Sequence, residues 1–77
     1  MNDEIITSLE EKLVIIQHEI AKERAAVMKL MAHPLDASAS KEDVTARQNA
    51  MHAHSDRLRT LEMQNHIFES AIKKLRG

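Results

Sequence analysis

The sequence predicts an all-α protein, an antiparallel two-helix hairpin of the coiled-coil type that forms a single domain over residues 1–77. Three observations carry this prediction. The chain has one glycine and one proline, which argues against a sheet with several turns. Apolar residues recur at alternating steps of three and four along most of the chain. There is one phenylalanine and no other aromatic residue, and an aliphatic core suits the packing of helix on helix.

The first helix is expected over residues 3–33. Asn2 is a suitable N-cap, and Asp3 and Glu4 would lie at the positive end of the helix dipole. Pro34 disfavours helical geometry at the residue before it, so the helix should end there. The apolar repeat of this helix, broken only by Glu23, comprises Ile6, Leu9, Leu13, Ile16, Ile20, Val27 and Leu30.

The second helix is expected over residues 40–76, after a loop at about 34–40. Ser40 is the best N-cap because two acidic residues follow in the first turn, although Asp36 and Ser38 are alternatives. The repeat then resumes with three polar members. It comprises Val44, Arg47, Met51, His54, Leu58, Leu61, Asn65, Phe68, Ile72 and Leu75.

The two repeats can be aligned as facing layers of an antiparallel hairpin. A tight connection places Leu30 opposite Val44. In that alignment Glu23 falls between Arg47 and His54, so we expect these three residues to form a polar cluster inside the hairpin. Such a cluster fixes register more than it adds stability.

We call the facing repeat residues of the two helices the seam. Apolar residues remain outside this seam, and an isolated two-helix hairpin is marginally stable on its own. Exposed apolar stripes usually mark an interface. In the expected alignment the last residues of the second helix extend beyond Asn2 and have no partner in the chain. The predicted partner interface therefore comprises Ala21, Ala25, Met28 and Ala32 (in line with Val14), Ala46, Ala50 and Ala53, and Ile67, Ala71, Ile72 and Leu75.

The sequence offers no catalytic, metal or cofactor site. It has no cysteine and no glycine-rich phosphate loop. His52 and Asp56 share a helical face, but two ligands are too few for a metal site. His54 in the seam could make the hairpin or its assembly sensitive to acid. We therefore expect a protein that is not an enzyme and that needs no cofactor.

Charge and hydropathy favour a cytoplasmic protein that does not insert into membranes. The formal net charge is −1, so no global field steers the chain to nucleic acid. The longest apolar run, residues 13–16, is far too short to cross a bilayer. Lys73, Lys74 and Arg76 form a basic cluster, but a hairpin would bring it beside the acidic N-terminus. The charge pattern thus favours protein partners over nucleic acid.

The layout of a helix, a short turn containing proline and aspartate, and a longer helix resembles the small hairpins of bacterial type III secretion systems. His33-Pro34-Leu35-Asp36 is similar to the turn of the needle subunit but lacks its second proline. Residues 68–72, Phe-Glu-Ser-Ala-Ile, are more similar to the cytosolic co-chaperone of that subunit. The resemblance implies a co-chaperone whose apolar stripes cover an aggregation-prone secretion subunit or bind a second chaperone.

Three functional hypotheses follow. The first is a non-enzymatic adaptor or co-chaperone that packs its apolar stripes on helices of a partner protein. The second is a self-assembling hairpin, either a homodimeric four-helix bundle or a filament subunit. The third is a small nucleic-acid-binding regulator that uses the C-terminal basic cluster.

Overall fold

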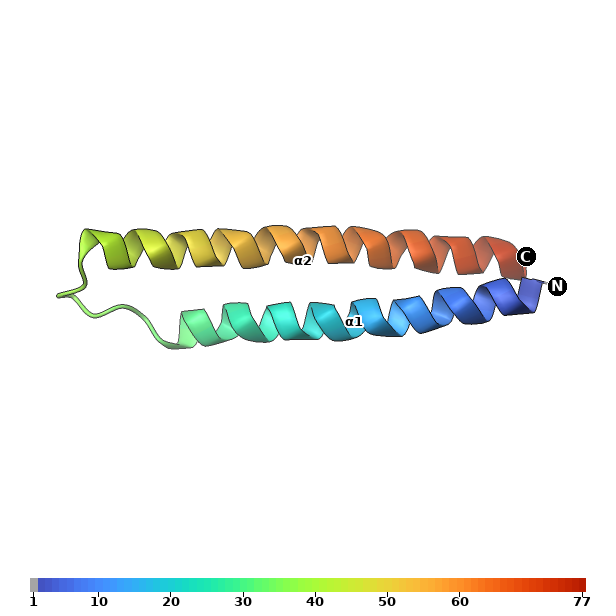
Figure 1. Cartoon of the computed structure of the whole chain (residues 1–77), viewed down its shortest axis with the longest axis horizontal. Helices are drawn as coiled ribbons and strands as arrows, with labels where there is room; N and C mark the ends of the chain where they lie inside the picture. The colour runs from blue at the N-terminus through green and yellow to red at the C-terminus, as the bar shows by residue number, and fades with distance from the viewer. Residues whose placement is uncertain (1) are drawn as a thin grey trace.

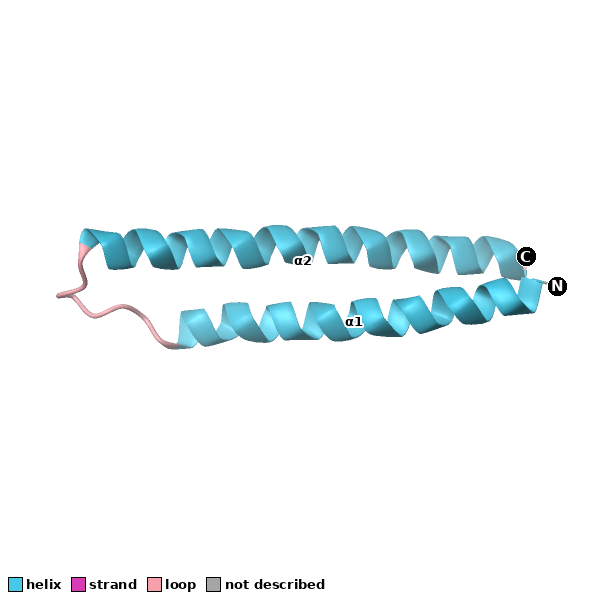
Figure 2. Ribbon diagram, viewed as in Figure 1, coloured by secondary structure: helices cyan, strands magenta, loops and turns pink. Residues whose placement is uncertain are grey.

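The computed structural model describes residues 2–77 and confirms the predicted helical hairpin. Helix α1 spans Asn2–Ala32 and helix α2 spans Lys41–Arg76. The two helices run antiparallel, with both ends of the chain at one tip and the connecting loop at the other (Figures 1 and 2). The molecule is a rod with extents of 61 × 14 × 14 Å. In a rod of this shape, side chains can be buried only along the line where the two helices meet, and all others face solvent.

Local sequence signals define both ends of α2. Ser40 is the N-cap of α2: its hydroxyl accepts the Asp43 N–H at 3.1 Å, and the Asp43 carboxylate accepts the Ser40 N–H at 3.3 Å. This capping box satisfies two backbone donors reciprocally. At the other end, Gly77 adopts a φ of +107° and donates its N–H to the Lys74 carbonyl. A glycine enters this left-handed region without a steric penalty.

The predicted seam is the least exposed part of the molecule. Its most buried members are Ile6, Ile16 and Ile20 of α1 and Ile72 of α2. The remaining seam positions are half-buried, apart from the buried Glu23 and the exposed Val44. Every repeat position except Val44 therefore faces the other helix, as the spacing predicted.

The register of the two helices differs from the expected one by about one helical turn. Glu23 contacts His54, and the Asn2 side chain donates to the Leu75 carbonyl at 3.4 Å. The loop, residues 33–40, is more extended than a tight connection, so the first turns of α2 project beyond the end of α1 (Figure 1). The unpartnered segment is therefore at the loop end, where Val44 is 39 % exposed.

This register corrects the prediction that the C-terminal residues of the chain overhang. Ile72 is only 7 % exposed, and Leu75 is half-buried beside the start of α1. Both residues belong to the seam. Neither described helix contains a segment sufficiently long and apolar to traverse a bilayer.

Candidate functional site

A buried carboxylate, that of Glu23, lies in the middle of the seam. Glu23 is 7 % exposed although it is charged. Its Oε2 lies 2.6 Å from Nδ1 of His54, and its Oε1 accepts from Nη1 of Arg57 at 2.8 Å. Because an ionised carboxylate can only accept, His54 Nδ1 carries the hydrogen in this contact. The hydrogen bonds from His54 and then Arg57 hold the pKa of Glu23 below its ordinary value of 4.5.

The structure brings together two of the three residues predicted for this cluster. Glu23 and His54 meet, but Arg47 lies nearer the loop and donates to the His33 carbonyl instead. That carbonyl follows the last turn of α1, so the Arg47 guanidinium caps the negative end of this helix. Arg57 takes the expected place of Arg47 because the shifted register brings a later turn of α2 opposite Glu23.

The outer face of α1 carries apolar side chains that point away from α2. Val14 is 65 % exposed and Met28 69 %, whereas the exposed Ile15 lies on the flank toward α2, in a groove shared with Phe68. The predicted interface residues of this helix lie on the same face and are all exposed. They are Ala21, Ala25, Met28 and Ala32. We name the set Val14, Ala21, Ala25 and Met28 the α1 outer face.

The predicted interface residues of α2 fall into two groups. Four of them are exposed or only half-buried near the loop and at mid-helix: Ala46, Ala50, Ala53 and Ile67. Ala50 lies toward α1, beside Leu30 and His33. The other three, Ala71, Ile72 and Leu75, are half-buried or buried in the hairpin and are not available as a free surface.

Several exposed apolar residues were absent from the predicted interface. Ile5, Ile15, Met31 and Met63 are each more than half exposed. Ile15 was identifiable in principle because it follows Val14 and is not a seam position. Met63 and Ile67 lie one turn apart on α2, which gives this helix a small apolar patch of its own.

Two exposed ion pairs join the helices, and the one made by Arg76 reduces the free positive charge of the C-terminus. Arg76 Nη2 lies 3.1 Å from Glu10 Oε2, and Arg24 Nη2 lies 3.2 Å from Glu62 Oε1. The acidic start of α1 thus lies against the basic end of α2. The C-terminal basic cluster is partly neutralised within the chain.

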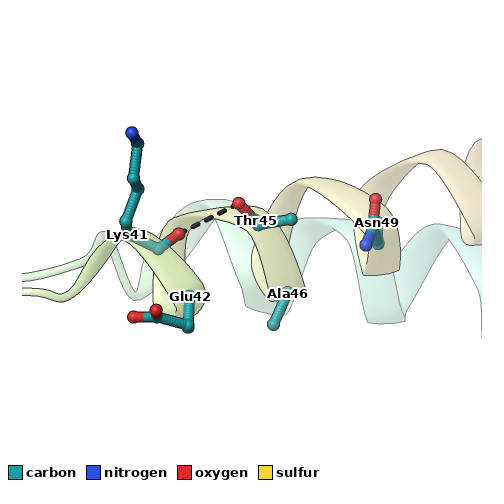
Figure 3. A pocket seen from close by; sticks show the side chains of 5 residues that line it. All are labelled: Lys41, Glu42, Thr45, Ala46 and Asn49. Carbon is teal, nitrogen blue, oxygen red and sulfur yellow. Dashed lines mark hydrogen bonds between the residues drawn. The ribbon is translucent and has the colours of Figure 1, made fainter.

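The depressions of the surface are shallow; some lie on the face of one helix and others in the grooves between the two helices. One of them, shown in Figure 3, is lined by Lys41, Glu42, Thr45, Ala46 and Asn49. All five belong to the exposed face of a single helix, and Thr45 donates its hydroxyl to the Lys41 carbonyl rather than into the depression. Over residues 2–77, no three histidine or acidic side chains gather closely enough to hold a metal ion.

Comparisons of the chain with models of protein families, with curated proteins and with solved structures found no match. The site is therefore defined by its own geometry. Its two notable elements are a buried polar cluster that sets the register and an exposed apolar face on α1.

Proposed function

We propose that this protein is a non-enzymatic interaction module that packs the α1 outer face against helices of other protein chains. The observation that carries the proposal is the exposure of Val14 and Met28 along one side of a helix whose other side is already packed. Large apolar side chains grouped on one face are the usual mark of a protein interface.

The energetics of the hairpin support the same proposal. A single seam between two helices leaves most of the surface in water, and the core consists of a few isoleucines. Burial of the α1 outer face against another helix would add apolar contact at about 25 cal/mol per Å² removed from water. A hairpin of this size therefore gains stability from a partner helix.

The resemblance to secretion-system hairpins suggests a specific form of this function. In that form the partner helix belongs to an aggregation-prone secretion subunit or to a second chaperone, and the hairpin keeps it unassembled. The support for this form is the layout of the turn at residues 33–36 and the sequence of residues 68–72.

Photo-crosslinking in the cell that makes the protein tests the proposal. A benzophenone amino acid is placed at Met28, on the α1 outer face, and in a second variant at Ser55, an exposed position of α2. We expect a covalent protein adduct from position 28 that is lost when Val14→Glu is added, because a buried carboxylate destabilises an apolar contact. Equal crosslinking from both positions, or none from position 28, would contradict the proposal.

A further inference from the structure

We infer that a groove along one flank of the hairpin binds a third helix, an amphipathic helix of another protein that carries acidic residues beside its apolar face. This surface is separate from the α1 outer face, so the inference goes beyond the proposed function. It rests on the positions of two hollows, on the backbone that lines them and on the charges around them.

Two hollows between the helices open on the same side of the hairpin. The hollow near the chain ends has a volume of about 310 Å³ and is lined by Lys12, Ile15, Ile16, Gln64 and Phe68. The hollow near the loop has a volume of about 370 Å³ and is lined by Ala26, Lys29, Leu30, His33, Ala50 and His54. Ile15 and Lys29 are separated by about four whole turns of α1, so they lie on one flank of that helix. Phe68 and His54 have the same separation in α2. We name the two hollows and the flank between them the lateral groove.

The spacing of the two hollows suits the side chains of one helix. The hollows lie about four helical turns apart, or about 21 Å along the rod. In an amphipathic helix, apolar residues two heptads apart return to the same face. A single helix packed along the lateral groove therefore places one apolar side chain in each hollow. It would cover Ile15, which is 63 % exposed, and the half-buried Phe68 and Ala50.

The backbone around the lateral groove favours a helix over an extended peptide. Every lining residue except His33 belongs to α1 or α2, where backbone N–H and C=O groups pair within their own helix. An extended peptide finds no free backbone partner here of the kind that a sheet edge offers. A helix satisfies its own backbone groups and needs side-chain contacts only.

The charges around the two hollows are of one sign. Lys12 lines one hollow and Lys29 the other, and both are exposed. Within the described part of the chain neither lysine makes an ion pair, and no acidic residue lines either hollow. Between the hollows, Lys22 and Glu19 lie 3.7 Å apart and offset each other. Carboxylates beside the apolar face of the bound helix would thus pair with Lys12 and Lys29, which makes an acidic helix the complementary partner.

Titration of the full chain with two designed peptides tests the inference. Each peptide is an amphipathic helix of about three heptads with leucine at the apolar positions. One peptide has glutamate at the flanking positions, and the other has lysine there. Fluorescence anisotropy should show the glutamate peptide binding about tenfold more tightly, because two attractive exposed pairs replace two repulsive ones. Equal affinities, or no binding of the glutamate peptide, would overturn the inference.

Variants of the chain separate the lateral groove from other surfaces. Lys12→Glu combined with Lys29→Glu should transfer the preference to the lysine peptide. Ala50→Leu fills the hollow near the loop and should weaken binding of the glutamate peptide by about fivefold. Ala25→Leu, the same change on the α1 outer face, should leave the affinity unchanged. Circular dichroism establishes that each variant is still helical. An Ala25→Leu variant as weak as Ala50→Leu, or a preference that the lysine changes do not move, would contradict the inference.

Side-chain methyl signals in nuclear magnetic resonance spectra locate the bound peptide. We expect the largest shifts at Ile15, Ala26 and Ala50. Shifts centred on Val14 and Met28 instead would place the peptide on the α1 outer face, which would overturn this inference and leave the proposed function standing. Conversely, a peptide seated in the lateral groove, with no protein adduct from position 28 in the cell, would support this inference and contradict the proposed function alone.

Discussion

The carboxylate of Glu23 and the imidazole of His54 lie 2.6 Å apart across the seam, and Arg57 closes the cluster from the same side. Elsewhere most seam residues are apolar, and they could slide by one turn and still make apolar contacts. The Glu23 cluster can form in one register only. It therefore selects the register that the apolar repeat leaves open.

Glu23→Gln should lower the free energy of unfolding, because a neutral amide gives up charge-assisted hydrogen bonds to His54 and Arg57. The matched control is Glu62→Gln, which breaks the exposed pair with Arg24 and should cost at most about 1 kcal/mol. Urea denaturation of both variants gives the comparison. Equal losses would show that the seam cluster has no special role.

Acid should remove the contribution of Glu23. Its pKa is lowered in the folded chain, so the unfolded chain takes up a proton first as the pH falls below about 4.5. The stability that Glu23 contributes is present above that pH and is lost as the pH falls through its folded pKa. Thermal melts from pH 7 to pH 3 should show the difference between the native chain and Glu23→Gln shrinking over this range. A constant difference would contradict the lowered pKa.

Ser40→Ala should destabilise the hairpin by about 1 kcal/mol, because it removes the acceptor of the capping box. Ser38→Ala is the control, since Ser38 is an exposed loop residue outside the box. Chemical denaturation should separate the two variants. If Ser38→Ala were the more damaging change, α2 would begin at another cap.

Ile72→Ala should cost about 2 kcal/mol, since this residue is buried in the seam. Ile67→Ala should change stability by about 0.5 kcal/mol or less, because its side chain is 59 % exposed. Measurement in dilute protein keeps association from masking the difference. If Ile67→Ala were more destabilising than Ile72→Ala, the alignment expected from the sequence, in which Ile72 extends beyond the first helix, would be the correct one.

Asn65→Leu should stabilise the hairpin by about 1 kcal/mol. The Asn65 Oδ1 is buried without a hydrogen-bond partner among the described residues, although its Nδ2 donates to Glu69 at 3.2 Å. Replacing an unsatisfied buried polar atom by an apolar group removes its desolvation cost. Asn49→Leu, at an exposed position, controls for helix propensity and should have little effect. A loss of stability in Asn65→Leu would mean that the amide is satisfied.

The sequence predicted the hairpin well because helix content, caps and seam are local properties. Spacing identified every seam position that faces the other helix, and the residues after Ser40 indicated the start of α2. These signals lie within a few residues of one another. They do not depend on how the chain is folded back.

The register was the part that spacing could not determine. A heptad repeat is satisfied again after each turn, so apolar layers alone do not distinguish neighbouring alignments. The observed alignment, which the Glu23 cluster selects, also requires the extended loop, and a loop of this length has no fixed geometry readable from its residues. As a result Arg57 was missed, Arg47 was misplaced, and Ile72 and Leu75 were assigned to the outside.

The proposed function requires that protein covers the α1 outer face in the cell. Because the chain has no cysteine, a Met28→Cys variant carries a single thiol whose alkylation rate reports exposure, with Ser55→Cys as the control. We expect Cys at position 28 to be alkylated slowly in intact cells and rapidly in dilute purified protein, while position 55 reacts rapidly in both. Rapid alkylation at position 28 in intact cells would contradict the claim.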